Sequence, residues 1–94
     1  MIVVGLLTLE LYIPGARSLK EKRMTLRSVK ERLKAFNVSV AEVEHQNLWQ
    51  RAELGVVAVG SSRDMVDRTL ATAASEIDRV EPGLVIRSEV EFLT

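Results

Sequence analysis

The sequence predicts an α+β domain whose strands and helices follow the order βαββαβ. Apolar residues occupy every second position over residues 3–13, which is typical of a half-buried strand. They recur at helical spacing in two later segments, one after Ser18 and one after Ser61. A chain of 94 residues is long enough for one small hydrophobic core, so we expect a single domain over residues 1–94.

The first half of the chain predicts a strand, a helix and a second strand. Pro14-Gly15 ends the first strand, and Ser18 followed by Glu21 has the spacing of a helix capping box. The helix should run to about Ala35, and "NVSVAEVEH" (37–45) predicts the second strand. The apolar stripe expected on this helix comprises Leu19, Leu26, Val29, Leu33 and Phe36.

The second half predicts a strand, a helix and a strand. "RAELGVVAVG" (51–60) lies close enough to the second strand to form a hairpin, and Gly55 within it suggests a bulge or a close backbone approach. Ser61 and Asp64 resemble a second capping box. The following helix should bury Val66, Leu70, Ala73, Ile77 and Val80. "LVIRSEVEF" (84–92) closes the chain, with Leu84, Ile86, Val90 and Phe92 expected to point inward.

Right-handed crossovers convert this order into one topology. It is a ferredoxin-like sandwich, a four-stranded antiparallel sheet with both helices on one face. Because this fold hosts many unrelated functions, function has to be inferred from particular sites.

Composition excludes several classes of protein. The chain has no cysteine, which removes disulfides, thiolate catalysis and cysteine-ligated metal, and its lone histidine makes a protein-only metal site unfavourable. We therefore expect no metal, no cofactor and no catalytic residues. No apolar run approaches the ~20 residues that cross a bilayer, and the apolar opening lacks a preceding basic segment and a cleavage site. A cytoplasmic protein without membrane contact is expected.

The clearest functional hint is a basic stripe on the first helix. Residues 17–34 hold eight basic and two acidic residues, a local balance of +6, and the remainder carries −6. At 100° per residue, five cations share an arc of ~80° that contains no carboxylate. These residues, with Arg17 just before the helix, are the predicted RNA-binding set: Arg17, Lys20, Arg23, Arg27, Lys30 and Lys34. A plain solvated surface and an acidic protein partner are the alternatives.

Lys22 lies on the same helix but within the apolar stripe. Its ammonium could extend past the end of the core to solvent. The alternative is a buried ion pair with a carboxylate.

The first loop offers a weaker site, for a small anion. Gly15, Arg17 and Ser18 lie at a helix N-terminus, where free N–H groups and cations favour phosphate. The sequence is not a Walker loop. A phosphate sensor or phosphate-dependent enzyme is thus an alternative function, although no loop pattern of acyl-phosphate hydrolases is present. A capped helix start is the simpler interpretation.

The segment "VEHQNLWQRAELG" (43–55) contains the single histidine and the single tryptophan. His45 has no recognisable nucleophile or acid partner, so we do not expect it to be catalytic. Trp49 is expected to be buried as the plug of the hairpin end, and stacking on an RNA base is the alternative.

The face of the sheet away from the helices should be rich in acidic residues, with Tyr12 as its one aromatic residue, so it should repel phosphate. Alternating charges could instead make this face self-complementary in a homodimer, which would be a dimeric protein-interaction module. The residues expected there are Thr8, Glu10, Tyr12, Arg51, Glu53, Arg87, Glu89 and Glu91.

The blocks "IPGARSLKEKR" and "NVSVAEVEHQNLWQRAELGV" resemble the YlxP-like family of small bacterial proteins, a domain of unknown function. The resemblance covers nearly the whole chain. It implies a ferredoxin-like fold and a link to translation, because family genes commonly lie beside those for an initiation factor and for ribosome-binding factor A. It offers no established catalytic residues to carry over onto this sequence. Our leading hypothesis is a non-enzymatic accessory protein that contacts ribosomal RNA, or the ribosome, through the basic helix.

Overall fold

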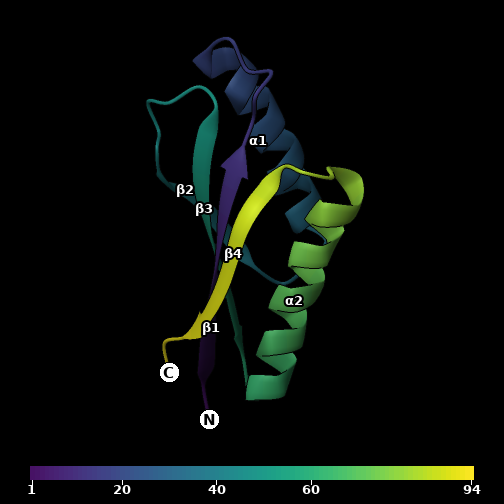
Figure 1. Cartoon of the computed structure of the whole chain (residues 1–94). Coiled ribbons are helices and arrows are strands. Elements are labelled where there is room, and N and C mark those ends of the chain that lie inside the picture. Colours follow the sequence, from purple (N-terminus) through teal and green to yellow (C-terminus); the bar gives the residue numbers. More distant parts are fainter.

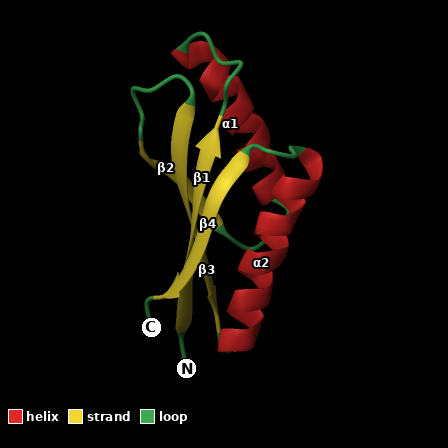
Figure 2. Cartoon of the chain, viewed as in Figure 1, coloured by secondary structure: helices red, strands yellow, loops and turns green.

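A computed structural model describes all residues, 1–94, and shows the six expected elements in the expected order. Their bounds are β1 Val3–Tyr12, α1 Leu19–Leu33, β2 Ser39–Glu44, β3 Arg51–Gly60, α2 Arg63–Val80 and β4 Val85–Phe92. All strand pairs are antiparallel, in the sheet order β2-β3-β1-β4. Both helices cover one face of this sheet and leave the other bare (Figures 1 and 2). The predicted ferredoxin-like α+β fold is confirmed.

The central strand β1 organises the core. Its residues alternate between buried and half-buried along almost the full strand, as the sequence period predicts. Leu7, Leu9 and Leu11 face the helices and are at most 1% exposed. They belong to one cluster of 18 buried apolar residues, to which β3 and both helices also contribute.

The two helices bury most of the stripes that their spacing predicts, whereas Leu19, Phe36 and Val80 are only half-buried. α1 buries Leu26, Val29 and Leu33, and α2 buries Val66, Leu70, Ala73 and Ile77. Neither helix is long and apolar enough to cross a membrane.

Side-chain caps fix where each helix begins. Ser18 Oγ accepts a hydrogen bond from the Glu21 N–H, which confirms the first predicted cap. The second cap was predicted one residue too early, because Ser62, and not Ser61, accepts from the Met65 N–H at 3.1 Å. Two consecutive serines offered the same chemistry, and the structure uses the one nearer the helix.

A bulge in β4 makes the prediction that Ile86 points into the core wrong. The register between β1 and β4 shifts between Glu10 and Leu11, so Val85 pairs with Leu11 and Arg87 with Glu10. Ile86 lies between them as the extra residue and is 53% exposed. Val90 pairs with the buried Leu7 but is 41% exposed, because β4 is an edge strand.

Candidate nucleic-acid interface

The predicted RNA-binding cations lie along α1 and are accessible to solvent. Arg23, Arg27 and the remaining members are exposed, except for Lys30, which is half-buried. Since α1 is one continuous helix from Leu19 to Leu33, these side chains follow a line of about 20 Å at 1.5 Å per residue.

Most of these cations have no carboxylate partner in the chain. Of the predicted set, only Lys34 forms a salt bridge, to Glu31 at 2.8 Å, and both side chains are more than 60% exposed. The six salt bridges of the molecule include none from the other five members of the set, Arg17, Lys20, Arg23, Arg27 and Lys30. Their positive charge is therefore directed at solvent and is not neutralised within the protein.

The stripe borders a shallow groove between α1 and the edge strand β2. The groove has a volume of about 440 Å³, and Glu42 is its only contribution from β2. Its lining residues are Arg23, Leu26, Arg27, Lys30, Glu31, Lys34 and Glu42. Four of these seven residues are cationic and two are acidic, so the groove itself keeps a positive balance.

Lys22 is buried in an ion pair, so the prediction that its ammonium extends to solvent is wrong and the alternative of a buried pair is confirmed. Its side chain is 2% exposed, and its Nζ lies 2.9 Å from Glu42 Oε2 and 2.6 Å from the carbonyl oxygen of His45, to which it donates. Glu42 Oε2 is itself buried and accepts no well-directed hydrogen bond. The ammonium is thus aimed at the carbonyl, and it ties the first turn of α1 to the end of β2.

The polar groups of the first loop already form hydrogen bonds within the chain. The backbone N–H of Arg17 donates to the carboxylate of Glu21, and Ser18 Oγ is occupied as the helix cap. A hollow of about 340 Å³ beside Gly15 is lined by Glu21 and by no cation. An incoming anion would have to displace the Glu21 carboxylate, so the small-anion site remains a prediction that this geometry does not favour.

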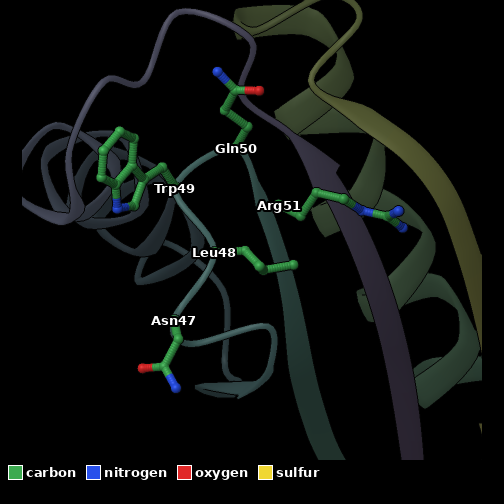
Figure 3. A pocket seen from close by; sticks show the side chains of 5 residues that line it. All are labelled: Asn47, Leu48, Trp49, Gln50 and Arg51. Atoms are coloured by element: carbon green, nitrogen blue, oxygen red, sulfur yellow. The ribbon is translucent and has the colours of Figure 1, made fainter.

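Trp49 is not the plug of the hairpin end, and that prediction is wrong. Its side chain is 52% exposed, and the neighbouring Leu48 is 47% exposed. Ile13 and Ala16 of the first loop are buried and already close this end of the core, where the Ile13 N–H donates to the Gln50 carbonyl. Figure 3 shows Trp49 and Arg51 projecting to opposite sides of the chain.

His45 has a structural role in this connection. It adopts a left-handed backbone conformation, with φ 63, and its carbonyl accepts from both Lys22 Nζ and the Leu48 N–H. Its imidazole Nε2 lies 4.0 Å from Glu10 Oε1, and Glu10 in turn contacts Arg51. No nucleophile lies in this set of contacts.

The bare face of the sheet contains an acidic row and an apolar region. Glu44 pairs with Glu53, and Glu53 pairs with Glu10, so three carboxylates lie side by side across β2, β3 and β1. Arg87 of β4 ends the row, and its hydrogen bond to Glu89 raises the pKa of its guanidinium. The apolar region consists of Val4, Leu6, Val57 and Val59, in which Val59 is 57% exposed.

Sequence reasoning missed two features of the site. The groove depends on Glu42 facing α1, which follows from the period of β2 once its register with Leu54 is known. The exposure of Trp49 had a signal in its polar neighbours, because Gln46, Asn47 and Gln50 leave too little apolar surface to cover an indole.

Comparison with known proteins assigns the chain to a family. The family described as "Protein of unknown function (DUF503)" matches residues 4–90. The chain belongs to this family. It is 39% identical over 77 residues to "Uncharacterized protein YlxP" of Bacillus subtilis (strain 168), which covers 81% of this chain and 84% of that protein. The resemblance to the YlxP-like family is thus confirmed.

The fold of this family member is also similar to a solved structure, the "De novo designed protein Foldit4". The TM-score is 0.62, the sequence identity is 16%, and the match covers 100% of this chain and 98% of that chain. At this identity the likeness concerns the fold alone.

Proposed function

We propose that the protein is a non-enzymatic accessory factor that binds ribosomal RNA, or the ribosome, through the basic stripe of α1. In this proposal it acts in the cytoplasm, during translation or ribosome assembly. The observation that supports it is the set of five cations, Arg17 and four on α1, that share no salt bridge with the protein. Neutralising phosphates with such side chains releases counterions, which drives binding to nucleic acid.

The arrangement of charge favours RNA over an acidic protein partner. The stripe extends for about 20 Å along one helix, which suits a row of phosphates. The bare face of the sheet is lined by the row Glu44, Glu53 and Glu10, which would repel the same phosphates. RNA would therefore not contact the bare face of the sheet.

The first prediction is that binding to ribosomal RNA depends steeply on salt and on this stripe. If Lys20, Arg23, Arg27, Lys30 and Lys34 all contact phosphates, a plot of log affinity against log salt has a slope of roughly −3.5 to −4.5. The double variant Arg23→Glu/Arg27→Glu reverses two of these charges. It should reduce the magnitude of the slope by roughly 1.4 to 1.8 or more. Sedimentation with ribosomal subunits and titration of purified ribosomal RNA, at several salt concentrations, measure both quantities.

The matched control is Arg32→Glu/Arg68→Glu. Both arginines are exposed, one lies on α1 outside the stripe and one lies on α2, and the change in net charge is identical. We expect its slope to stay within about one unit of the wild-type slope. Equal binding by the two double variants would contradict the proposal.

A homodimer is a second proposal, and a specific feature of the bare face favours it. The apolar region of Val4, Leu6, Val57 and Val59 lies on the two central strands and is covered by no element of the chain. Contiguous apolar surface of this kind marks sites of protein association. Two copies related by a two-fold axis would cover it and leave both basic stripes accessible.

A further inference from the structure

The connection between β2 and β3 holds an exposed aromatic side chain, Trp49, beside a shallow and open hollow. The hollow has a volume of about 520 Å³, and its lining residues are Asn47, Leu48, Trp49, Gln50 and Arg51 (Figure 3). The groups free to meet a ligand there are the Trp49 indole and the Asn47 side-chain amide. The Gln50 amide already donates to the carbonyl oxygens of Pro14 and Ala16, and Arg51 projects to the other side of the chain and pairs with Glu10. An indole is suited to stacking on a nucleobase, and an amide is suited to hydrogen bonding at its edge.

The main chain of this connection is anchored at both ends. At its start, the carbonyl of His45 accepts hydrogen bonds from Lys22 Nζ at 2.6 Å and from the Leu48 N–H at 3.0 Å. At its end, the Gln50 carbonyl accepts from the Ile13 N–H at 2.8 Å, and the Gln50 amide donates to the carbonyl of Ala16 at 3.3 Å. Trp49 is thus exposed on a fixed backbone, which limits the entropy lost on binding.

These anchors also place the connection at one end of the basic stripe. Lys22 belongs to the first turn of α1, and Ala16 directly precedes Arg17. Figure 1 shows the connection and the start of α1 at the same end of the molecule. A nucleic acid whose phosphates follow Arg27, Arg23 and Lys20 toward the start of α1 would reach Trp49.

Charge in this segment selects an anionic ligand. Between Glu44 and Glu53 the sequence has no carboxylate. Arg51 already pairs with Glu10, so the cations without a salt bridge at this end of the molecule are Arg17, which precedes Ser18, and Lys20 in the first turn of α1. A protein ligand bound through Trp49 and Leu48 alone would gain nothing from these cations. A base with its adjacent phosphate would use both the indole and the charge.

We infer that Trp49 stacks on an unpaired base of the RNA whose phosphates bind the α1 stripe, so the preferred ligand is a helix interrupted by a loop or bulge. This inference rests on the proposed function and adds a preference for unpaired nucleotides. A-form duplex RNA shows no base face to an aromatic side chain, so the stacking contribution should vanish on an uninterrupted duplex.

The test uses the full chain and two RNAs of equal length, a stem with an unpaired loop and a continuous duplex. Trp49→Ala should weaken binding to the stem-loop by roughly 5- to 100-fold and leave duplex binding unchanged. Trp49→Phe, which keeps a ring, should lose less. Since Trp49 is the single tryptophan, stem-loop RNA should also quench the intrinsic fluorescence of the wild-type protein.

The outcomes separate the inference from the proposed function. Unchanged stem-loop affinity of Trp49→Ala, together with loss of the salt slope in Arg23→Glu/Arg27→Glu, would overturn the inference alone. Unchanged affinity in both variants would overturn both. If Trp49→Ala failed to bind intact subunits but bound deproteinised ribosomal RNA normally, the connection would contact ribosomal protein and the inference would be wrong.

Discussion

At the scale of single residues, Lys22 shows how one side chain joins the two layers of the site. Its ammonium is buried between α1 and β2, where it contacts Glu42 and the His45 carbonyl. Removing a charged partner from such a pair leaves the other charge poorly solvated, which destabilises a protein more than the pair itself stabilises it. The position of the Trp49 connection therefore depends on Lys22.

The second prediction concerns this ion pair. Lys22→Met should lower the free energy of unfolding by about 2 to 4 kcal/mol. This is slightly less than the usual cost of removing one partner of a buried ion pair, because the Glu42 side chain is 21% exposed and keeps some contact with water. Adding Glu42→Leu should recover a large part of the loss, since no unpaired carboxylate then remains. Urea denaturation measures both, and Lys20→Met on the exposed face is the control, expected within about 0.5 kcal/mol of wild type. A fully stable Lys22→Met variant would contradict this account.

At the scale of elements, the packing of α2 on β1 depends on a missing side chain. A Cβ at Gly5 would lie 2.7 Å from Val66 Cγ1 and 2.9 Å from Leu70 Cδ1. Both neighbours are buried and belong to the apolar stripe of α2. The helix therefore approaches the central strand more closely than a larger residue would allow.

The third prediction follows from this close approach. Gly5→Ala should destabilise the fold by about 1 to 3 kcal/mol, which for a domain of this size lowers the Tm by roughly 5 to 20 °C. Gly55→Ala is the matched control within the same sheet, because its Cβ would lie 3.4 Å from Val43 Cγ1. Thermal unfolding followed by circular dichroism compares the two. Equal Tm values for the two variants would show that α2 can shift without cost.

The existence and order of the elements could be predicted from the sequence because each has a clear apolar period. The departures from a regular period could not. The bulge beside Ile86 follows from pairing with Glu10 and Leu11, and the one at Val43 lies opposite the step between Glu53 and Leu54 of β3. Gly55 itself pairs in regular register with Thr8 and Ala41, so the irregularity predicted at Gly55 lies instead at Val43. The size and apolarity of Trp49 predict burial, but its side chain is exposed because Ile13 and Ala16 already close this end of the core.

The candidate site was predictable to a similar extent. The shared arc of Arg23, Arg27 and Lys30 follows from helical geometry, so the structure places these side chains as expected. The groove beside them and the Lys22–Glu42 pair depend on how α1 packs on β2, which is a tertiary contact. A single sequence contains no direct signal for that packing.

At the scale of the whole molecule, the proposed dimer gives the fourth prediction. Val59→Lys places a charge in the apolar region of the bare face and should convert a concentration-dependent dimer into a monomer, because an unpaired ammonium is costly to bury. Light scattering and sedimentation velocity measure the mass. Met65→Lys on α2, where Met65 is 56% exposed, is the control and should stay dimeric. A wild-type protein that is monomeric at every concentration would exclude the dimer.

The separation of charge between the two layers has a consequence for how the molecule meets a partner. Its net charge is zero, yet the cations of α1 and the carboxylates of Glu44, Glu53 and Glu10 lie on different faces and give it an electric dipole moment. The field of a polyanion would exert a torque on that dipole and turn the molecule before contact. Most encounters would then begin with the helices foremost, and so with the correct side already presented.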